Sequence, residues 1–585
     1  QNYIGRSNWA TNAYFAGTIN SVLVYNTALT SAQIFDNYVY ASSRYINSAP
    51  VATNRSLPAI QEDVATAKNF GANVASMTRG VIDIDAAALK GIAVVDADYT
   101  RGWWEYTTDG ITWRPILAPS SSTALLLAAN STNKIRFRPD RDFFGTATLT
   151  YRAWDQTTGT SGNTSTIATT GIASAFSANQ GTITASVSAV DDAPTLLIGR
   201  PATSAMTYDR VIGRFGTGNG EIKYPQFADL DSAGNLYVGD VMNNRIMAFK
   251  PDGTFLRTWG SAGVGTGQFD GPAGLAIDGT DTLYVSDEMN HRIQIFTTSG
   301  TFLGSFGSFG TGNSQFNRPV NITFGNDGYL WISDYMNNRI QRYDRSGRYV
   351  STLAPSGTNV GEIASPWQIA MDNNNSIYYG SDNSVHHRVQ KFTQTNSTTW
   401  ASAWGVGGAS SSADGAFNRP LGVIVDLFNS VWVADFYNNR VQKLNPSDGS
   451  FLSKIGGAAS SEPGLFNEPI AMFTDNTGGM YVVENTGSRI QRFDMTASSV
   501  SVNKNTTVTL PFALTDGDAA SQTAKVTAQS SVPSLATVAV SYTSGRNGTI
   551  TITPLTNRIG TTTITVTYTD SNNTKMTKTV SVNFN

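Results

Sequence analysis

Hydrophobic and polar residues alternate in short segments along most of the chain, and Gly, Asn, Asp and Ser separate these segments. Between residues 208 and 495 the segments recur in six similar units. Each unit contains an apolar segment after a proline, an aromatic segment ending in an acidic or polar residue, a segment opening on arginine, and a last segment after a glycine turn. This pattern predicts four antiparallel strands per unit, joined by hairpin turns. Long helical periodicity is almost absent, so we expect an all-β, multidomain protein.

The arginines of successive units are 47, 47, 49, 52 and 49 residues apart. A period near fifty with several short strands is typical of a propeller, in which each unit forms one blade. We interpret the recurring charged residues as structural, with the aspartates capping turns and the arginines pairing with carboxylates or carbonyls between blades. These positions are Asp240, Arg245, Asp287, Arg292, Asp334, Arg339, Arg388, Asp435, Arg440 and Arg489.

The sixth unit ends after its third predicted strand, at Asp494. An additional strand-like segment, residues 210–215, precedes the first unit and is similar to the fourth strands of the other units. We therefore expect this segment to complete the sixth blade. Such closure removes the open sheet edges of the ring.

The motif Asp-x-x-Asn-x-Arg, followed by Ile or Val, occurs in four of the six units. Residues 208–495 thereby resemble the NHL family of six-bladed propellers. The fourth unit departs from the motif at residues 381–384, and Glu484 replaces the aspartate in the sixth unit. Some NHL-like propellers are lyases with metal-bound histidines, and others bind RNA.

Two observations argue against these activities here. The three histidines, His291, His386 and His387, lie at or beside the position before the repeat arginine, so we interpret them as scaffold residues. Adjacent side chains on a strand, such as those of His386 and His387, point to opposite faces. The net charge of −3 lacks the basic character of an RNA-binding surface.

The length of 585 residues allows several domains, and only 14% of the residues are charged. The absence of cysteine favours a disulfide-free microbial surface protein. The sequence has no run of 18 apolar residues, so we expect no membrane span. It opens at Gln1 without a signal peptide, and we expect it to be a piece of a longer polypeptide. The predicted domains are residues 1–48, 49–197, 208–495 and 496–585.

Residues 1–45 read as two strands followed by a short helix, which a capping box of Thr30 and Gln33 opens. The segment resembles the C-terminal end of a laminin-G-like, concanavalin-type jelly roll. A fragment of this length cannot bury a core by itself. The resemblance therefore implies that other sequence or another subunit completes it.

Residues 50–195 contain a predicted hairpin with strands near Trp104 and Trp113 and a turn at residues 109–110. The module resembles the cadherin-like, immunoglobulin-type repeats of microbial adhesins. Residues 496–585 alternate clearly, for example at 561–568, and resemble the same repeats more loosely.

In those repeats carboxylates gather where modules join and bind calcium, which takes six to eight oxygen ligands. The alternative is that these carboxylates form hydrogen-bonded turns. The candidate calcium ligands are Glu62, Asp63, Asp83, Asp85, Asp155, Asp191, Asp192, Asp516, Asp518 and Asp570.

Asn-x-Ser/Thr sequons could carry glycans if the host glycosylates asparagine. They are Asn54, Asn130, Asn163, Asn321, Asn374, Asn396, Asn505, Asn547 and Asn572. Their number is about what chance gives in a chain so rich in Asn and Thr.

The sequence has no nucleophile elbow, no HExxH motif and no cysteine nucleophile. We expect a non-enzymatic extracellular structural protein, the repeating subunit of a surface filament assembled head to tail. The alternatives are a segment of a large surface adhesin and a carbohydrate- or ligand-binding propeller. The expected partners are further copies of the chain, with glycans or other surface proteins as alternatives, and neither nucleic acid nor a membrane.

Overall fold

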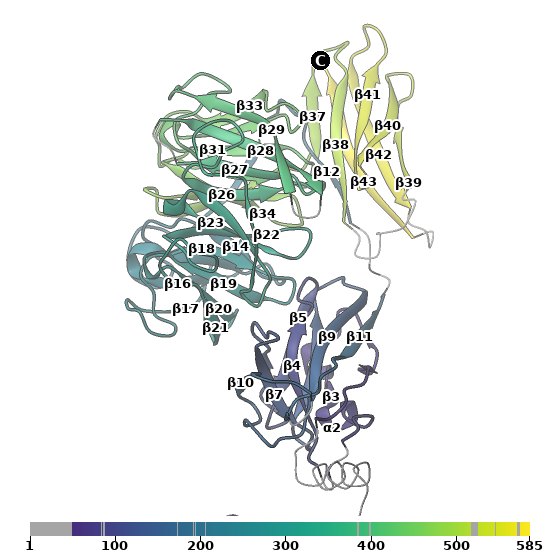
Figure 1. Ribbon diagram of the computed structural model, residues 1–585. Coiled ribbons are helices and arrows are strands. Elements are labelled where there is room, and N and C mark those ends of the chain that lie inside the picture. Colours follow the sequence, from purple (N-terminus) through teal and green to yellow (C-terminus); the bar gives the residue numbers. More distant parts are fainter. Residues whose placement is uncertain are drawn as a thin grey trace, which may run out of the picture.

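The computed structural model of the chain describes residues 49–83, 85, 88–171, 174–190, 192, 195–204, 206–382, 385–396, 399–515, 525–544, 546–569 and 574–585. These residues form an all-β protein with a ring of four-stranded sheets and two β-sandwiches (Figure 1). The predicted jelly-roll end, residues 1–48, lies outside the described residues. None of the described helices is long and apolar enough to cross a membrane.

The ring is a six-bladed propeller, as the repeat count predicted. First strands of neighbouring blades contact one another, so these strands surround the axis and the fourth strands lie outermost. The blades are β14 (Ala228–Leu230), β15 (Leu236–Asp240), β16 (Arg245–Phe249) and β17 (Phe255–Trp259); β18 (Pro272–Ile277), β19 (Thr282–Asp287), β20 (Arg292–Thr297) and β21 (Phe302–Phe306); β22 (Pro319–Phe324), β23 (Leu330–Asp334), β24 (Arg339–Tyr343) and β25 (Tyr349–Leu353); β26 (Pro366–Met371), β27 (Ile377–Ser381), β28 (His387–Asn396) and β29 (Thr399–Gly408); β30 (Pro420–Val425), β31 (Val431–Asp435), β32 (Arg440–Leu444) and β33 (Phe451–Gly456); and β34 (Pro469–Thr474), β35 (Gly479–Glu484), β36 (Arg489–Asp494) and β13 (Thr207–Ile212).

Strand β13 closes the ring, because it pairs antiparallel with β36 from Thr207–Asp494 to Ile212–Ile490. The predicted closing strand is therefore present, but it begins and ends three residues earlier than the predicted segment 210–215. Residues 213–215 instead start the connection to the next blade, where Phe215 forms an isolated bridge with Ile222.

The repeat motif fixes each turn between the second and third strands. In the third blade Asp334 accepts hydrogen bonds from the Asn317 backbone N–H (2.7 Å), Asn337 Nδ2 (2.9 Å) and Arg339 Nε (2.6 Å). Arg339 also donates from Nη2 to the carbonyl of Gln315 (2.8 Å), in the connection from the preceding blade. The motif thus ties every such connection to a turn, because buried charges persist only when they are paired.

The same carboxylate–arginine pair occurs in four other blades, as Asp240–Arg245, Asp287–Arg292, Asp435–Arg440 and Glu484–Arg489. The fourth blade differs because Ser381 stands at the carboxylate position and donates to the carbonyl of Ala364 (2.7 Å). Arg388 there donates to the carbonyl of Thr358 (2.9 Å).

A second set of bonds links each blade to the next one. Asn244, Asn338 and Asn439 have left-handed backbones, with φ of 52°, 50° and 51°. Each accepts a backbone N–H of the following connection through Oδ1, at 2.8–2.9 Å. Across the closure from the sixth blade to the first, Ser488 Oγ accepts the Tyr224 backbone N–H (3.2 Å) in the same way.

The antiparallel order gives the propeller two different faces. The connection face consists of the blade-to-blade connections and the turns between second and third strands. The hairpin face consists of the loops between first and second strands and between third and fourth strands. These two names are used below.

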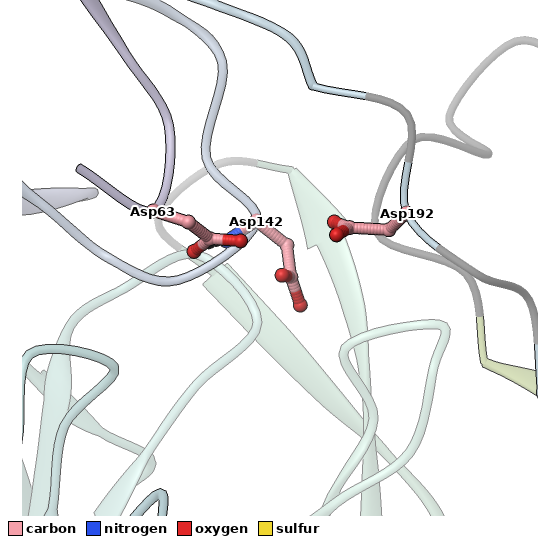
Figure 2. A group of neighbouring side chains, drawn as sticks. All are labelled: Asp63, Asp142 and Asp192. Atoms are coloured by element: carbon pink, nitrogen blue, oxygen red, sulfur yellow. Dashed lines mark hydrogen bonds between the residues drawn. The ribbon is translucent and has the colours of Figure 1, made fainter. Parts of the chain in front are cut away.

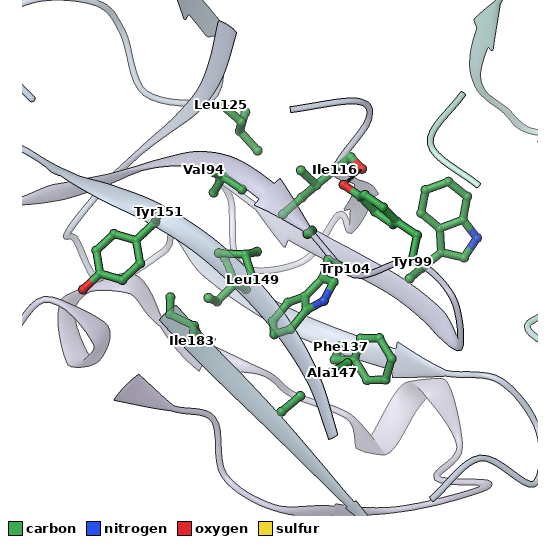
Figure 3. Close-up of a cluster of buried hydrophobic side chains, with 14 of the residues drawn as sticks. Val94, Tyr99, Trp104, Ile116, Leu125, Phe137, Ala147, Leu149, Tyr151 and Ile183 are labelled. Atoms are coloured by element: carbon green, nitrogen blue, oxygen red, sulfur yellow. Dashed lines mark hydrogen bonds between the residues drawn. The ribbon is translucent and has the colours of Figure 1, made fainter. Parts of the chain in front are cut away.

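The first sandwich packs two sheets around a core that includes Trp104, Phe137, Leu149 and Tyr151 (Figure 3). Its elements are β1 (Arg55–Ser56), β2 (Ile60–Gln61), η1 (Thr66–Lys68), β3 (Ala72–Asn73), α2 (Val74–Met77), β4 (Gly91–Ala97), β5 (Gly102–Thr107), β6 (Arg114–Pro115), β7 (Thr123–Ala128), β8 (Lys134–Pro139), β9 (Gly145–Trp154), β10 (Thr164–Thr166) and β11 (Gly181–Ser188). The predicted hairpin near Trp104 is the antiparallel pair β5–β6.

The second sandwich has one sheet in the order β12-β38-β41-β40 and another in the order β37-β43-β42-β39. Its strands are β12 (Thr195–Ile198), β37 (Ser499–Val502), β38 (Val508–Thr515), β39 (Lys525–Ser530), β40 (Ala536–Ser544), β41 (Asn547–Pro554), β42 (Gly560–Thr569) and β43 (Lys575–Phe584). The predicted domain boundary at residue 197 falls inside β12. This strand follows the first sandwich in sequence but contributes Leu196 and Ile198 to the core of the second.

The first sandwich is joined to the hairpin face of the second and third blades. Trp103 Nε1 donates to Asp278 Oδ2 (2.9 Å), and the buried Arg345 pairs with Asp140 and with Asp278 (3.4 Å). At Gly328, which has a φ of 79°, a Cβ would lie 1.7 Å from the Thr100 carbonyl oxygen. The two domains therefore share a closely packed, buried interface.

The second sandwich also lies against hairpin-face loops, those of the fourth and fifth blades. Asn547 Nδ2 donates to the Leu427 carbonyl (2.6 Å) and its Oδ1 lies 3.3 Å from Asn373 Nδ2. Figure 1 shows the two sandwiches beside the propeller, with the strands β37–β43 at the upper right and β4–β11 below.

The strand β12 gives the first testable prediction. Leu196 is fully buried in the second sandwich, so Leu196→Ala should lower the free energy of unfolding of that sandwich by about 2–5 kcal/mol. Urea unfolding combined with limited proteolysis at residues 499–585 measures this loss. Thr195→Ala, on the same strand but less buried, is the control. Selective loss of the first sandwich in Leu196→Ala would contradict the assignment.

Candidate functional site: the axial cavity and the hairpin-face cleft

First strands of five blades line a cavity of about 240 Å³ on the propeller axis. Leu275, Ile322, Ile369 and Phe473 are among its apolar lining residues, and Asn321, Thr323 and Gln368 add polar groups. One carboxylate, that of Asp229, belongs to this wall. Converging carboxylates on the axis, which a catalytic propeller would favour, are therefore not found among the lining residues described.

The polar groups of the wall satisfy backbone N–H groups of the neighbouring first strands. Asp229 Oδ2 accepts from Ile277 N–H (2.8 Å), and Asn321 Oδ1 accepts from Ile369 N–H (3.0 Å). Gln368 Oε1 accepts from the N–H groups of Val423 (3.2 Å) and Met472 (3.1 Å). These side chains pair the backbone N–H groups at the inner edges of the blades. Leaving such buried N–H groups unpaired would cost folding free energy.

Burial raises the pKa of Asp229 to about 6, against the lowering effect of the Ile277 and Leu230 N–H groups. Asn321 and Gln368, in the third and fourth blades, also accept backbone N–H groups of other first strands, but they carry no charge.

The axial cavity shares Asp229 and Ile277 with a larger cleft of about 770 Å³. This cleft lies between the first sandwich, at Arg141 and Asp142, and the hairpin face of the first, second and sixth blades. Some of its charged and polar groups contact each other or neighbouring side chains. Arg492 contacts Asp475 (2.9 Å) and Asp209 (2.8 Å), and Asp281 accepts two hydrogen bonds from Ser232 (2.8 and 2.6 Å).

Three carboxylates converge at the rim of the cleft, those of Asp63, Asp142 and Asp192 (Figure 2). One oxygen of each lies within 4.8 Å of the others. Burial, and then the charges of Asp63 and Asp192, raise the pKa of Asp142 to about 6. The group could provide three of the six to eight oxygens that calcium takes.

The predicted calcium ligands are thus only partly brought together. Asp63 and Asp192 meet, and the third member, Asp142, was missed because it lies in a loop far from both in sequence. Glu62, next to Asp63, accepts the Val190 N–H. Asp191, Asp516, Asp518 and Asp570 lie outside the described residues.

The other predicted ligands of the first sandwich lie at its opposite end. Burial raises the pKa of Asp83, the Asp85 N–H lowers it, and the charges of Asp85 and Asp155 raise it. Asp155 Oδ1 accepts from the Thr157 N–H (2.8 Å) and hydroxyl (2.6 Å), as in a hydrogen-bonded turn. The strands of the sandwich separate these residues from Asp63.

The glycosylation prediction is wrong at two sequons. Asn321 and Asn547 are buried. The Asn321 side chain accepts the Ile369 N–H and the Asn547 side chain donates to the Leu427 carbonyl, so neither has room for a glycan. The exposed sequons are Asn54, Asn130, Asn163, Asn374, Asn396 and Asn505, and Asn572 lies outside the described residues.

Two histidines have the role of the repeat asparagines. His291 Nδ1 accepts the Arg318 N–H (3.1 Å), and His387 Nδ1 accepts the Arg419 N–H (2.8 Å). Both residues are thus part of the bonds between blades. His291 also has the same left-handed backbone, with a φ of 56°.

The NHL repeat profile matches residues 269–296, which cover β18, β19 and most of β20 in the second blade. A comparison of the sequence with curated proteins found no match.

Several solved structures are similar to the chain. A protein of unknown function from Bacteroides thetaiotaomicron VPI-5482 is 16% identical, with 68% of this chain and 91% of that chain covered and a TM-score of 0.38. A streptogramin B lyase is 14% identical, with 60% and 90% covered and a TM-score of 0.35. The PQQ-bound aldose sugar dehydrogenase from Streptomyces coelicolor is 13% identical, with 50% and 99% covered and a TM-score of 0.34. The likeness concerns the fold alone.

The raised pKa of Asp229 predicts that Asp229→Asn gains folding stability relative to the unaltered chain as the pH rises. The folded pKa of about 6 lies above the ordinary value of 3.8, so the stability that this group contributes is present at low pH and is lost as the pH rises through 6. The stability of Asp229→Asn relative to the unaltered chain should therefore rise by about 2 kcal/mol between pH 4 and pH above 7. Its value at pH 4 reflects the amide's single acceptor oxygen, where the carboxylate accepts the N–H groups of Leu230 and Ile277 on separate oxygens. Urea unfolding across this pH range measures the difference.

Asp252→Asn is the matched control, because hydrogen bonds from Thr254 hold the pKa of exposed Asp252 below its ordinary value. Its stability contribution is present above the ordinary pKa and lost as the pH falls, so it should show no gain above pH 7. Equal behaviour of the two variants would contradict the assignment at Asp229.

Proposed function

We propose that the chain is a non-enzymatic extracellular structural protein, the repeating subunit of a surface filament that assembles head to tail. The observation that carries the proposal is the union of propeller and sandwiches into one closely packed body. Buried pairs such as Arg345–Asp140 and the pairing of β12 with β38 join the domains without a long linker. A subunit of this kind can transmit force along a fibre.

The resemblances of the flanking modules support the same proposal. Immunoglobulin-type repeats of adhesins and the end of a laminin-G-like jelly roll belong to extracellular surface proteins. In the proposed filament, residues 1–48 bury their apolar residues in contacts with another copy of the chain. A contact between unlike surfaces of successive copies gives an open filament.

Self-assembly of the purified chain of residues 1–585 tests this function. We expect particles whose mass rises with protein concentration in sedimentation velocity, and filaments with one copy per axial repeat in electron microscopy. A chain that stays monomeric at all accessible concentrations would contradict the filament. Beaded strings of separate domains would favour a segment of a large adhesin.

The cleft favours a second candidate, the binding of a small polar ligand such as a saccharide. It is lined by arginines, carboxylates, hydroxyls and Tyr481, and its volume of about 770 Å³ suits a ligand of that size. A glycan array probed with the full chain tests it. Binding of the chain to a glycan that is weakened by Arg141→Ala would support this candidate function. An array on which the chain binds no glycan would contradict it.

A further inference from the structure

Exposed apolar side chains are concentrated on one face of the propeller. Between residues 207 and 495 the described part of the chain has thirteen exposed large hydrophobic residues. Eleven of them belong to the connection face, and the other two, Val211 and Val350, lie in outermost strands. The described loops of the hairpin face contain none. Such an accumulation on a surface marks an interaction site.

The turns of the connection face expose an apolar side chain at equivalent positions. Met242, Met289, Met336 and Tyr437 each lie two residues after the repeat aspartate and are about half exposed. The hydrogen bonds of that aspartate fix the turn, so the exposure follows from the repeat itself. Methionine adapts its shape to a partner surface.

The connections between blades add larger groups around these turns. Phe215, Val264 and Phe309 are 59%, 75% and 65% exposed. The Phe309 ring lies 4.9 Å from that of His291 in the adjoining turn, and Phe215 lies 6.3 Å from Tyr224. The apolar groups therefore extend from the turns to the outer part of the face.

Two pairs of oppositely charged groups lie between the apolar side chains. Glu288 contacts Arg318, and Asp382 contacts Arg419, in both cases between adjacent blades. Near the axis, Trp367 stacks on Phe227 with 6.3 Å between ring centroids. A partner of this face would thus meet an apolar centre at Trp367 and Phe227 and two charge pairs that are already satisfied within the propeller.

The two sandwiches cover only the hairpin face, so the described domains leave the connection face open. The chain carries a second apolar region in residues 1–48, which contain nine aromatic residues and only three charged ones, Arg6, Asp36 and Arg44. A segment of this composition gains free energy from burial against another surface.

Residues 1–48 lead into the end of the first sandwich that is remote from the propeller. Val51 bridges Ile82 there, next to α2 and the start of β8, whereas Asp140 just beyond the other end of β8 contacts the propeller. The residues at which this segment joins the first sandwich and the connection face thus lie at different ends of the described molecule. Contact between successive copies can bury the apolar side chains of both the segment and the connection face.

We propose that the connection face of the propeller receives residues 1–48 of the next copy of the chain. This inference rests on the proposed filament and names the two surfaces that join its subunits. The interface is heterologous, and it leaves a free face at one end of the filament and a free segment at the other.

The first experiment places charges on the connection face of the full chain. Met289→Glu combined with Phe309→Glu should raise the concentration at which half of the protein assembles by at least about tenfold, because burying carboxylates among apolar groups is unfavourable. Ile559→Glu, at a residue of the second sandwich that is 68% exposed, is the control and should assemble like the unaltered chain. Assembly of the double variant at the same concentration as the unaltered chain would overturn the inference. It would not contradict the proposed filament.

The second experiment uses the absence of cysteine in the chain. Full-length Met289→Cys and isotope-labelled full-length Ser21→Cys are mixed and oxidised, and the cross-linked species are weighed by mass spectrometry. We expect the mixed dimer to predominate. Predominant Met289→Cys homodimers would show face-to-face contact and overturn the inference.

The two experiments also separate the inference from the proposed function. A mixed dimer without filaments would support the contact and contradict the filament. Filaments without the mixed dimer would support the filament and overturn the contact. Absence of both would overturn both.

Discussion

Two consecutive strand pairings hold the molecule together. Within residues 195–212, β12 pairs with β38 and β13 pairs with β36, so this short stretch joins the second sandwich and closes the propeller. Both partner strands come about 300 residues later in the chain. The ring closes by backbone hydrogen bonds rather than by a covalent bond, in a chain without cysteine. Removal of either pairing would leave a sheet edge open.

In five blades the repeated carboxylate–arginine pair ties the connection that enters the blade to the turn between its second and third strands. The same network presents the side chains of the turns to solvent on one face. On the opposite face, hairpin loops such as residues 278–282 lie against the first sandwich through Trp103 and Arg138. The two faces therefore differ because the contacts described between the propeller and the sandwiches lie on the hairpin face.

The candidate site combines features of different origin. The axial cavity exists because the first strands are arranged in a ring, and its polar residues accept backbone N–H groups of these strands. The cleft and the group Asp63–Asp142–Asp192 exist only because the first sandwich is seated beside the propeller.

The sequence by itself determined the number of blades, the four strands in each and the closing strand, since these depend on local alternation and turn residues. It also indicated that the repeat aspartates and arginines are structural, because they recur at fixed positions within a turn. The structure shows no side-chain cap from these aspartates, which accept hydrogen bonds from the arginine of their own blade instead. Only the tertiary structure decided that β12 joins the second sandwich, that Asp142 meets Asp63 and Asp192, and that Asn321 and Asn547 are buried. The physical reason is that periodicity encodes which residues form a strand, whereas the choice of sheet and the burial of a loop depend on packing between segments remote in sequence.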